Sequence, residues 1–443
     1  MALSGLDIYK LLPKTNCRQC GLATCLAFAM QLAKKTLPIE KCPFVSLEAK
    51  STLEAQAMPA IKLITLGGNE LKFDIGNETV MFRHEEKFRN PTGVGFIIDD
   101  NLGGTEIKER LNRINQLKFE RVGQKLGVNL VALKQNKDAQ RYLEVTKLLL
   151  DNTTLPIMLM SSDLVALKQA AVISRERKPL LYSAVGENFA QIATIAKEFQ
   201  LPLVVTARDI DQLSQLTQEL NGLGVRELIL DTGIKPIADK IWDLTQLRRQ
   251  ALKKSNRALG YPSLAIIQQA DPYQEAIEAG AYIVKYAGIV LIKGLAAWEV
   301  LSILTLRQNV YTDPQKPLQI SPKLYPVGQV SRDSPVLITT NFSLSYYTVL
   351  TEVESSKIPA YILSVDTQGM SVLTAWAAEK FNAEVITKSL ESSKVKEIIG
   401  HKNLIIPGYV AMISGDLEDQ SGYRIIVGPK EAAGIPSFLK NLQ

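Results

Sequence analysis

The chain has 443 residues, of which 46% are hydrophobic and 22% charged, and its formal net charge is +6. This composition is that of a globular protein long enough for two or three domains, and the charge is too mild and dispersed to indicate nucleic-acid binding. The longest apolar stretch, 288–306, is interrupted by Lys293 and Glu299, so we expect no membrane span. Asp7 and Lys10 interrupt the apolar core that a signal peptide would need, and the cysteines form no disulfide framework, so we expect a reducing cytoplasm.

All four cysteines lie near the start of the chain, as Cys17, Cys20, Cys25 and Cys42, with Pro43 directly after the last. Three thiols in nine residues with a fourth before a proline favour one 4Fe-4S cluster. A structural zinc site, which usually pairs two short knuckles, and a redox dithiol are the alternatives. Small and apolar residues between the second cysteine and Met30 would limit the access of water to a cluster.

The cysteine segment is also the most basic part of the chain. Residues 1–50 hold seven Lys and Arg against three Asp and Glu, a formal +4. Such a surface suits docking of an acidic electron donor such as a ferredoxin, although charges that balance an anionic cluster explain it equally well.

Residues 46–58 read as a short helix, and 67–91 as a linker with a hairpin. Eight apolar, strand-like runs then follow, each before a segment of helical period: 93–98, 130–133, 156–160, 179–184, 202–206, 227–230, 263–267 and 288–292. This count predicts a TIM (βα)8 barrel.

Few residues at the ends of these strands carry catalytic chemistry. They are Asp99, Asp100, Ser161, Asp163, Asp231, Gln268 and Gln269. Several are expected to be helix N-caps, and the two histidines, His84 and His401, lie outside the barrel. The barrel is therefore expected to be a scaffold or docking surface, with no catalytic residue assigned.

A proline-rich break at 311–335 predicts a domain boundary. Beyond it, we predict five parallel strands with helices on both faces, in a Rossmann-like or flavodoxin-like domain: 335–341, 359–366, 383–387, 403–407 and 424–427. The loops after these strands contain hydroxyls, small residues and backbone amides, with almost no acid or base. They suit a large, amide-rich cofactor or a phosphate, and a nucleotide would fit them as well.

Several motifs together resemble the large (gamma) subunit of the corrinoid/iron-sulfur protein of the acetyl-CoA (Wood-Ljungdahl) pathway. They are I-Y-K-L-L-P-K-T-N-C-R-Q-C-G-L-A-T-C-L-A-F-A-M at 8–30, Y-T-D-P-Q at 311–315, T-T-N-F-S-L-S-Y-Y at 339–347, L-S-V-D-T-Q-G-M-S-V-L-T-A at 363–375, I-I-P-G at 405–408 and I-V-G-P at 426–429. One departure is Arg18-Gln19, where many relatives carry a glycine and an acid.

The resemblance implies an α/β protein with three parts: a 4Fe-4S domain at 1–58, a linker plus TIM barrel at 59–318, and a Rossmann-like corrinoid (cobalamin)-binding domain at 319–443. It implies that the four cysteines hold the cluster. The residues that it implies for corrinoid binding are Thr340, Asn341, Phe342, Ser343, Tyr346, Gly369, Met370, Ser371, Val372, Leu373, Thr374, Pro407, Gly408, Tyr409, Gly428, Pro429, Ala432 and Ala433.

The function implied is that of a methyl carrier. In the family, Co(I) accepts a methyl group from methyltetrahydrofolate on a separate methyltransferase and delivers it to acetyl-CoA synthase/CO dehydrogenase, while the cluster reductively reactivates Co(II). A small subunit completes a heterodimer, and a ferredoxin-like or reductive-activator protein donates electrons. Segments 59–92 and 311–335 are expected hinges between docking states.

The D-x-H-x-x-G motif that carries a cobalt-ligating histidine in many cobalamin proteins does not occur in the sequence. We therefore expect a base-off corrinoid without a histidine ligand, and the resemblance places Thr374 below the cobalt, unless this residue only packs or caps its helix. His401 is expected at the surface. The alternative functions are an iron-sulfur electron-transfer or reductive-activator protein with a nucleotide- or flavin-binding C-terminal domain, and a zinc-bearing barrel hydrolase.

Overall fold

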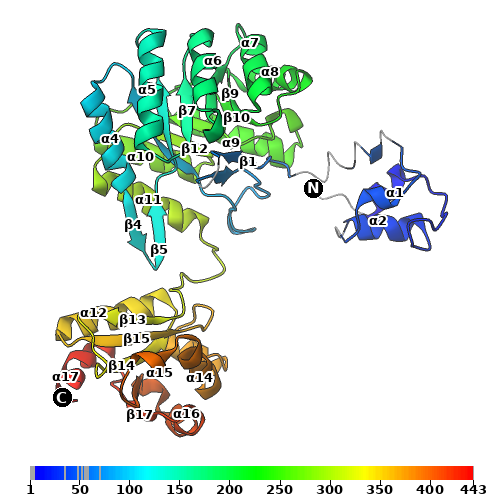
Figure 1. Cartoon of the computed structure of the whole chain (residues 1–443). Coiled ribbons are helices and arrows are strands. Elements are labelled where there is room, and N and C mark those ends of the chain that lie inside the picture. Colours follow the sequence, from blue (N-terminus) through cyan, green and yellow to red (C-terminus); the bar gives the residue numbers. More distant parts are fainter. Residues whose placement is uncertain are drawn as a thin grey trace. The chain divides into compact units, whose positions relative to one another are not determined.

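A computed structural model of the chain describes residues 5–33, 36–46, 49–50, 53, 59–68 and 71–442 (Figure 1). It contains two compact units, residues 1–118 with 127–311 and residues 119–126 with 312–443, and each is described by itself. The helix expected at 46–58 falls mostly outside the described residues. Among the helices that the structure describes, none combines the length and the apolar character that crossing a bilayer requires.

The cysteine segment forms two short helices and one 3-10 turn. Helix α1 spans Gly5–Leu11, α2 spans Cys25–Ala33 and η1 spans Ile39–Lys41. Their apolar side chains meet in a small core that includes Ile8, Leu12, Phe28, Ala29, Ile39, Cys25 and Cys42. The core is small because so short a segment can bury only a few apolar side chains.

Strands β1 (Ile64–Leu66) and β2 (Phe73–Ile75) pair antiparallel, which confirms the hairpin expected near this position. The hinge expected within 59–92 stays a prediction, but this hairpin is packed against the barrel. Ile64, Leu66 and Ile75 are buried in the same apolar cluster as the barrel strands, so the hairpin is part of the barrel core. The chain beyond it is held by a buried ion pair, in which Glu78 Oε2 lies 3.1 Å from Arg248 Nη2.

Eight parallel strands close into a barrel (Figure 1). They are β3 (Gly93–Asp99), β6 (Leu130–Lys134), β7 (Ile157–Met160), β8 (Leu180–Ala184), β9 (Leu203–Thr206), β10 (Leu228–Asp231), β11 (Leu264–Ile266) and β12 (Ile289–Ile292). Each strand pairs with the next in sequence, β12 pairs with β3, and a parallel bridge between Leu230 and Ser263 joins β10 to β11. The eight predicted strands and the (βα)8 barrel are therefore confirmed.

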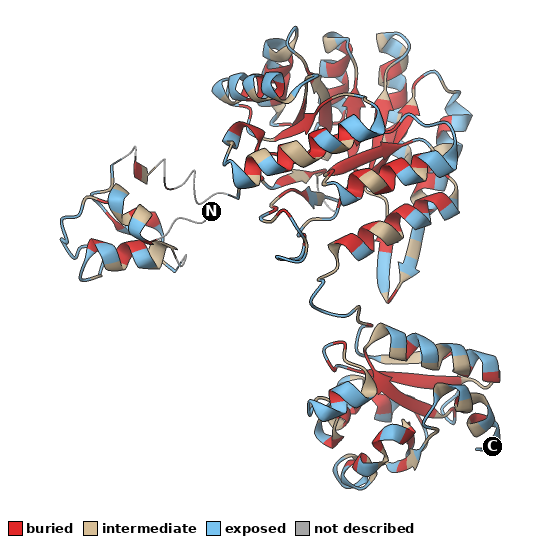
Figure 2. Cartoon of the chain, turned by 180° about the vertical axis from the view of Figure 1, so that it is seen from behind, coloured by how far each residue is buried: buried red, intermediate tan, exposed pale blue. Residues whose placement is uncertain are grey.

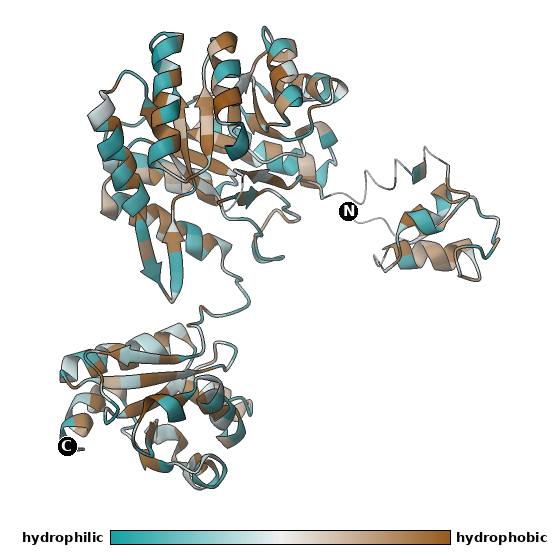
Figure 3. Ribbon diagram, in the orientation of Figure 1, coloured by the Kyte–Doolittle hydropathy of each residue, from teal (hydrophilic) through white to brown (hydrophobic). Residues whose placement is uncertain are grey.

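Eight helices surround the barrel: α4 (Gly104–Gln116), α5 (Ala139–Asn152), α6 (Leu164–Ile173), α7 (Phe189–Phe199), α8 (Ile210–Gly222), α9 (Ile237–Lys253), α10 (Pro272–Val284) and α11 (Ala297–Tyr311). Figure 2 shows buried strands inside helices whose outer faces are exposed. In Figure 3 the strands are mostly hydrophobic, and the outer faces of the helices are largely hydrophilic. An additional hairpin, β4 (Lys118–Arg121) with β5 (Gln124–Gly127), follows α4, and its residues 119–126 belong to the second unit.

The second unit contains a five-stranded sheet in the order β13-β15-β14-β16-β17. Four strands are parallel, namely β14 (Val336–Thr340), β15 (Ala360–Val365), β16 (Asn403–Ile406) and β17 (Arg424–Val427). The predicted strand at 383–387 is wrong, because these residues begin α14 (Ala383–Ser392). Asn382 Oδ1 accepts the Val385 amide as an N-cap, and Ile386 and Leu390 are buried on one helix face.

The fifth strand lies in the segment predicted as a break. Strand β13 (Leu324–Val327) pairs antiparallel with β15 at the edge of the sheet. Proline has no backbone N–H to donate. An edge strand has a partner on one side only, so Pro326 is tolerated there without the loss of a hydrogen bond to a second strand. The sheet is thus four parallel strands with one antiparallel edge strand, and not five parallel strands.

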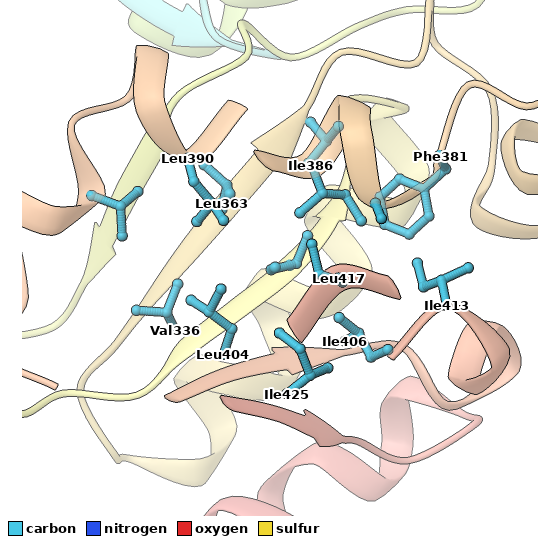
Figure 4. Close-up of a cluster of buried hydrophobic side chains, with 14 of the residues drawn as sticks. Val336, Leu363, Phe381, Ile386, Leu390, Leu404, Ile406, Ile413, Leu417 and Ile425 are labelled. Atoms are coloured by element: carbon cyan, nitrogen blue, oxygen red, sulfur yellow. The ribbon is translucent and has the colours of Figure 1, made fainter. Parts of the chain in front are cut away.

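Helices cover both faces of this sheet. One face carries α12 (Ser343–Ser356) and α17 (Ile435–Asn441), whose Tyr346, Val353 and Leu439 pack with Leu337 and Ile362. The opposite face carries α13 (Val372–Ala377), α14, α15 (Val395–Ile398) and α16 (Ser414–Ser421), over the core in Figure 4. Alternate residues of each strand point to opposite faces, which explains this two-sided core.

Candidate functional site

Cys17 and Cys20 lie in the loop before α2, and several residues of this loop have unusual backbone conformations. Lys14, Asn16 and Arg18 have φ of 60°, 48° and 65°, and Gly21 has φ of 84°. The Asn16 Oδ1 atom accepts a hydrogen bond from the Cys25 amide at 2.8 Å, and the Asn16 amide lies 3.4 Å from Cys25 Sγ. Side-chain and backbone contacts thus tie the loop to the first residue of α2.

The structure brings three of the four predicted cluster cysteines into one apolar core. Cys25 and Cys42 are buried and Cys20 packs against them, while Cys17 is exposed in the loop. Across the described residues, no three or more His, Cys, Asp or Glu side chains are grouped so as to hold a metal ion. Thiolates in an apolar shell are suitable donors for iron, so the residues fit the group, but their role as ligands stays a prediction.

The second candidate site lies where the parallel strands of the C-terminal sheet end. The order β15-β14-β16-β17 reverses direction between β14 and β16. In open α/β sheets, a ligand binds beyond the carboxyl ends of the strands at such a reversal. All four predicted loops follow these ends, so the topology brings them to one edge of the sheet.

Asn341 joins the loop after β14 to the loop after β15. Its side chain is only 1% exposed, and its Oδ1 atom accepts hydrogen bonds at 3.0 Å from the Thr367 and Gly369 amides. The Thr367 hydroxyl lies 3.0 Å from the same Oδ1. Its Nδ2 group donates to Asp366 Oδ1 at 3.1 Å and to Gln319 Oε1 at 3.3 Å.

Close backbone packing joins the other two loops. The Gly408 amide, at the start of η4 (Gly408–Ile413), donates to the Pro429 carbonyl at 3.0 Å. A Cβ atom on Gly408 would lie 2.6 Å from the Gly428 carbonyl oxygen, so only glycine fits this approach. The Tyr409 hydroxyl donates to Glu431, which adds a side-chain link between the loops.

Helix α13 lies between these two pairs of loops and packs against η4. At its start, the hydroxyl oxygens of Ser371 and Thr374 are 3.0 Å apart. Large apolar side chains are exposed on these elements, with Leu373 46%, Trp376 39%, Tyr409 40% and Met412 62% exposed. Sequence reasoning missed Trp376 and Met412, because both lie in apolar segments, VLTAWA and GYVAMI, in which local pattern does not show which side chains are exposed. Such an exposed patch is a feature of ligand and partner sites.

The remaining predicted residues differ in their access to this edge. Thr340 and Gly369 are buried, and the Thr340 hydroxyl has no hydrogen-bond partner among the described residues. Tyr346 is also buried, but its ring packs against Tyr325 at 4.9 Å between centroids on the α12 face of the sheet. Burial raises its pKa. The positions that are at least partly exposed are Phe342, Ser343, Met370, Ser371, Val372, Leu373, Thr374, Pro407, Tyr409, Gly428, Pro429, Ala432 and Ala433.

Neither histidine lies at the carboxyl edge of the sheet. The His401 ring accepts the Asn403 amide at Nδ1, 3.1 Å, and its Nε2 lies 2.9 Å from the Ser334 carbonyl oxygen. Asn403 is the first residue of β16 and Ser334 precedes β14, so His401 sits at the amino ends of these strands, where it is half-buried. His84 is exposed and stacks on Phe82 before the barrel begins.

At the carboxyl ends of the barrel strands, several of the predicted polar residues make structural contacts. Asp163 caps α6 by accepting the Val165 and Ala166 amides, as expected for an N-cap. Asp231 forms a buried ion pair with Lys240 at 2.8 Å. A cavity of about 340 Å³ remains, lined by residues that include Asp99, Arg110, Gln269, Glu275 and Lys293.

Glu299 lies fully buried near this cavity, behind Glu275. Burial, and then the neighbouring Glu275 carboxylate, raise the pKa of Glu299 to about 8. The Glu275 carboxylate accepts the Lys293 amide at 2.9 Å and the Gly294 amide at 2.7 Å. Neither Glu299 carboxyl oxygen has a hydrogen-bond partner among the described residues, and this burial favours the neutral form of the Glu299 carboxyl group.

Comparison with known proteins covers nearly the whole chain. The "Corrinoid/iron-sulfur protein large subunit" of Moorella thermoacetica is 42% identical over 441 residues, which are 99% of this chain and 99% of that protein. The "Acetyl-CoA decarbonylase/synthase complex subunit gamma" of Methanothermobacter thermautotrophicus is 34% identical over 100% of this chain and 99% of that protein. The chain belongs to the corrinoid/iron-sulfur protein large-subunit family.

Two family models match this large subunit. One, described as "CO dehydrogenase/acetyl-CoA synthase delta subunit", covers residues 63–439, and the other, described as "Putative Fe-S cluster", covers residues 12–44 and hence all four cysteines. Among solved structures, 7,8-dihydropteroate synthase from Vibrio fischeri is 13% identical with a TM-score of 0.42, and the match covers 57% of this chain and 100% of that chain.

Proposed function

We propose that this large subunit is a corrinoid-dependent methyl carrier that also holds a 4Fe-4S cluster. Its similarity over its full length to corrinoid/iron-sulfur protein large subunits is the observation that carries the proposal. The strand reversal and the exposed apolar rim at the carboxyl edge of the C-terminal sheet support a corrinoid site there. In this proposal, the C-terminal sheet is the Rossmann-like corrinoid-binding domain.

The bound corrinoid would supply the cobalt that accepts a methyl group from methyltetrahydrofolate on a methyltransferase and releases it to acetyl-CoA synthase. The chain's residues hold and shield this group. Backbone amides and hydroxyls of the four loops would bind its amide side chains, and Leu373, Trp376 and Tyr409 would exclude water from its apolar faces. Thr374 would lie below the metal, and its hydroxyl is too weak a donor to ligate it.

The cluster would supply the electron that restores oxidised cobalt to the active state. Cys17, Cys20, Cys25 and Cys42 are the proposed ligands, and the apolar core around Cys25 and Cys42 would limit access of water to it. Seven basic residues in the first fifty would attract an acidic electron donor, a ferredoxin-like or reductive-activator protein.

The proposed partners are the small corrinoid/iron-sulfur subunit, in a heterodimer, with the methyltransferase and acetyl-CoA synthase/CO dehydrogenase as transient partners. The archaeal relative is named as a subunit of an acetyl-CoA decarbonylase/synthase complex, which supports membership of such an assembly. The cytoplasm is the proposed location, because the four cysteines form no disulfide bond with one another and are the proposed ligands of the cluster.

Metal analysis and spectroscopy of the chain, purified without oxygen together with the small subunit, test the proposal. We expect about four iron atoms and about one cobalt atom per chain, with an EPR signal of base-off Co(II). Iron without cobalt, together with failure to bind added corrinoid, would overturn the proposal and favour an iron-sulfur electron-transfer protein.

A further inference from the structure

We propose that Asn341 is a positioning residue, whose buried carboxamide shapes the loop after β15, and not a residue that contacts the ligand. The inference rests on the proposed function only where it concerns the corrinoid. The hydrogen bonds on which it depends all lie between residues of this chain and need no ligand.

The Asn341 side chain has no polar atom left for a ligand. Its Oδ1 atom faces three donors, which are the amides of Thr367 and Gly369 and the Thr367 hydroxyl, all at 3.0 Å. Both hydrogens of its Nδ2 group have acceptors, in Asp366 and Gln319. A primary amide offers two donor hydrogens and two acceptor lone pairs, and the Thr367 and Gly369 amides with the Asp366 and Gln319 acceptors already use all four.

The loop that Asn341 holds cannot keep its shape by standard backbone pairing. Gln368 and Gly369 have φ of 57° and 75°, which places two consecutive residues in the left-handed region. A left-handed residue other than glycine persists only where its surroundings hold it. The Asn341 carboxamide supplies this support, because it bonds the residues on both sides of Gln368.

Gln319 supports the same arrangement from the other side. It pairs with Phe342 in an isolated antiparallel bridge, and the Ile320 amide donates to the Asn341 carbonyl at 2.8 Å. A Cβ atom on Gly369 would lie 2.7 Å from Gln319 Cγ. The loop is therefore packed between Asn341 and Gln319 and has little freedom to shift.

The loop leads directly into α13, which carries Thr374. The Thr367 hydroxyl also lies 3.0 Å from the Met370 carbonyl, and Ser371 follows as the residue before α13 begins. A change at Asn341 is therefore transmitted through four residues to the start of this helix. In the proposed corrinoid site, Asn341 would set the position of Thr374 below the metal without contacting the ligand.

Hydrogen exchange of the corrinoid-free chain tests the positioning role without any ligand. In Asn341→Ala, we expect the Thr367 and Gly369 amides to exchange about tenfold faster or more, with β15 protected as before. Ile338→Ala, which truncates a buried residue of the same strand, is the matched control, and it should lower protection across the sheet without singling out this loop. Unchanged protection at Thr367 and Gly369 in Asn341→Ala would overturn the inference.

Corrinoid binding to the same proteins adds a second readout. We expect Asn341→Ala to weaken binding by about tenfold or more and to alter the EPR spectrum of the bound Co(II) corrinoid, while Ile338→Ala leaves the spectrum unchanged. If the loop loosens but corrinoid binding and spectrum stay unaltered, the link to Thr374 is wrong. If the unaltered chain itself does not bind corrinoid, the proposed function fails while the exchange result still decides the positioning role.

Thr367→Val provides a milder variant should Asn341→Ala not fold. It removes only the hydroxyl between Asn341 Oδ1 and the Met370 carbonyl. We expect exchange at Gly369 to rise by about threefold or more, since the acceptor stays in place but the loop loses one constraint. No change at Gly369 in this variant would contradict the proposed role.

Discussion

The hydroxyl oxygens of Ser371 and Thr374 lie 3.0 Å apart at the start of α13, where Thr374 is exposed to solvent. Because a hydroxyl donates one proton, one of the two residues donates and the other accepts. The pair holds the Thr374 hydroxyl in one orientation. In the proposed corrinoid site, this position would present a weak donor to the metal.

Replacing Thr374 with histidine should supply the strong axial donor that the chain lacks. We expect the Co(II) EPR spectrum of Thr374→His to gain nitrogen hyperfine splitting, and reduction to Co(I) to become less favourable, because an imidazole ligand stabilises the more oxidised metal. Thr374→Val, with a similar volume and no donor atom, is the control and should keep the base-off spectrum. A spectrum without nitrogen splitting in the histidine variant would place Thr374 away from the metal.

The close approach at Gly408 should make this residue irreplaceable. Gly408→Ala would bring a methyl group within 2.6 Å of the Gly428 carbonyl and 2.8 Å of the Lys430 amide, so the two loops must separate. We expect a loss of about 1–3 kcal/mol in the free energy of unfolding, together with weaker corrinoid binding.

Gly415→Ala serves as the matched control for Gly408→Ala. Gly415 lies in α16 with nothing within 4 Å of its added Cβ, so alanine should stabilise the helix by about 0.5–1 kcal/mol. Denaturant unfolding and corrinoid titration of both variants give the comparison. Equal effects of the two changes would show that the loop contact is unimportant.

The buried pair of Glu299 and Glu275 predicts a pH-dependent stability of the barrel. The pKa of Glu299 is raised to about 8 in the folded chain, so the native state holds a proton that the unfolded state releases at lower pH. This contribution is complete below the ordinary carboxyl value, 4.5, and is lost as the pH rises through about 8. Unfolding of the unaltered chain should therefore become easier as the pH rises from 4.5 to about 8.

Glu299→Gln should remove much of this dependence, because a carboxamide has no proton that titrates in this range. As measured by denaturant unfolding, we expect the variant to gain about 1–3 kcal/mol relative to the unaltered chain as the pH rises from 4.5 to about 8. Glu275→Gln is the control, since its amide group cannot accept both the Lys293 and Gly294 amides and should destabilise at all pH values. Parallel pH curves for Glu299→Gln and the unaltered chain would show that Glu299 does not hold a proton in the folded chain.

Replacing Cys20 with alanine should separate the two proposed centres. We expect reductive reactivation to be lost, while methyl transfer from chemically pre-reduced protein continues, because the corrinoid loops lie in the other unit of the chain. Iron content should fall and cobalt content should not. Ala23→Ser, a small change in the same loop away from the thiols, controls for loop disturbance. Loss of methyl transfer from pre-reduced protein would contradict the division of labour between the centres.

The pattern of neighbouring residues in the sequence was sufficient to predict the barrel. Its eight strands are short apolar runs buried on both faces, so each is recognisable without knowledge of its neighbours. The grouping of the cysteines and the polar loops after the C-terminal strands are likewise properties of contiguous residues. Family membership follows from the same motifs, and the comparisons bear it out.

Residues 383–387 show where local pattern misleads. Val385, Ile386 and Thr387 are β-branched and predict a strand, yet they form a helix because burial of Ile386 and Leu390 against the sheet outweighs a small intrinsic preference. The edge strand at Leu324–Val327 was missed because its partner, β15, lies far along the chain.

The sequence by itself determined the barrel, the four thiols and the loops that end the parallel strands, because each depends on residues adjacent in the chain. The tertiary structure alone decided that Asn341 holds the loop after β15 and that the hairpin after Ile64 fills the barrel core. It also decided that Glu299 lies buried behind Glu275. Those roles arise from hydrogen bonds and burial between segments far apart in sequence, for which local composition carries no signal.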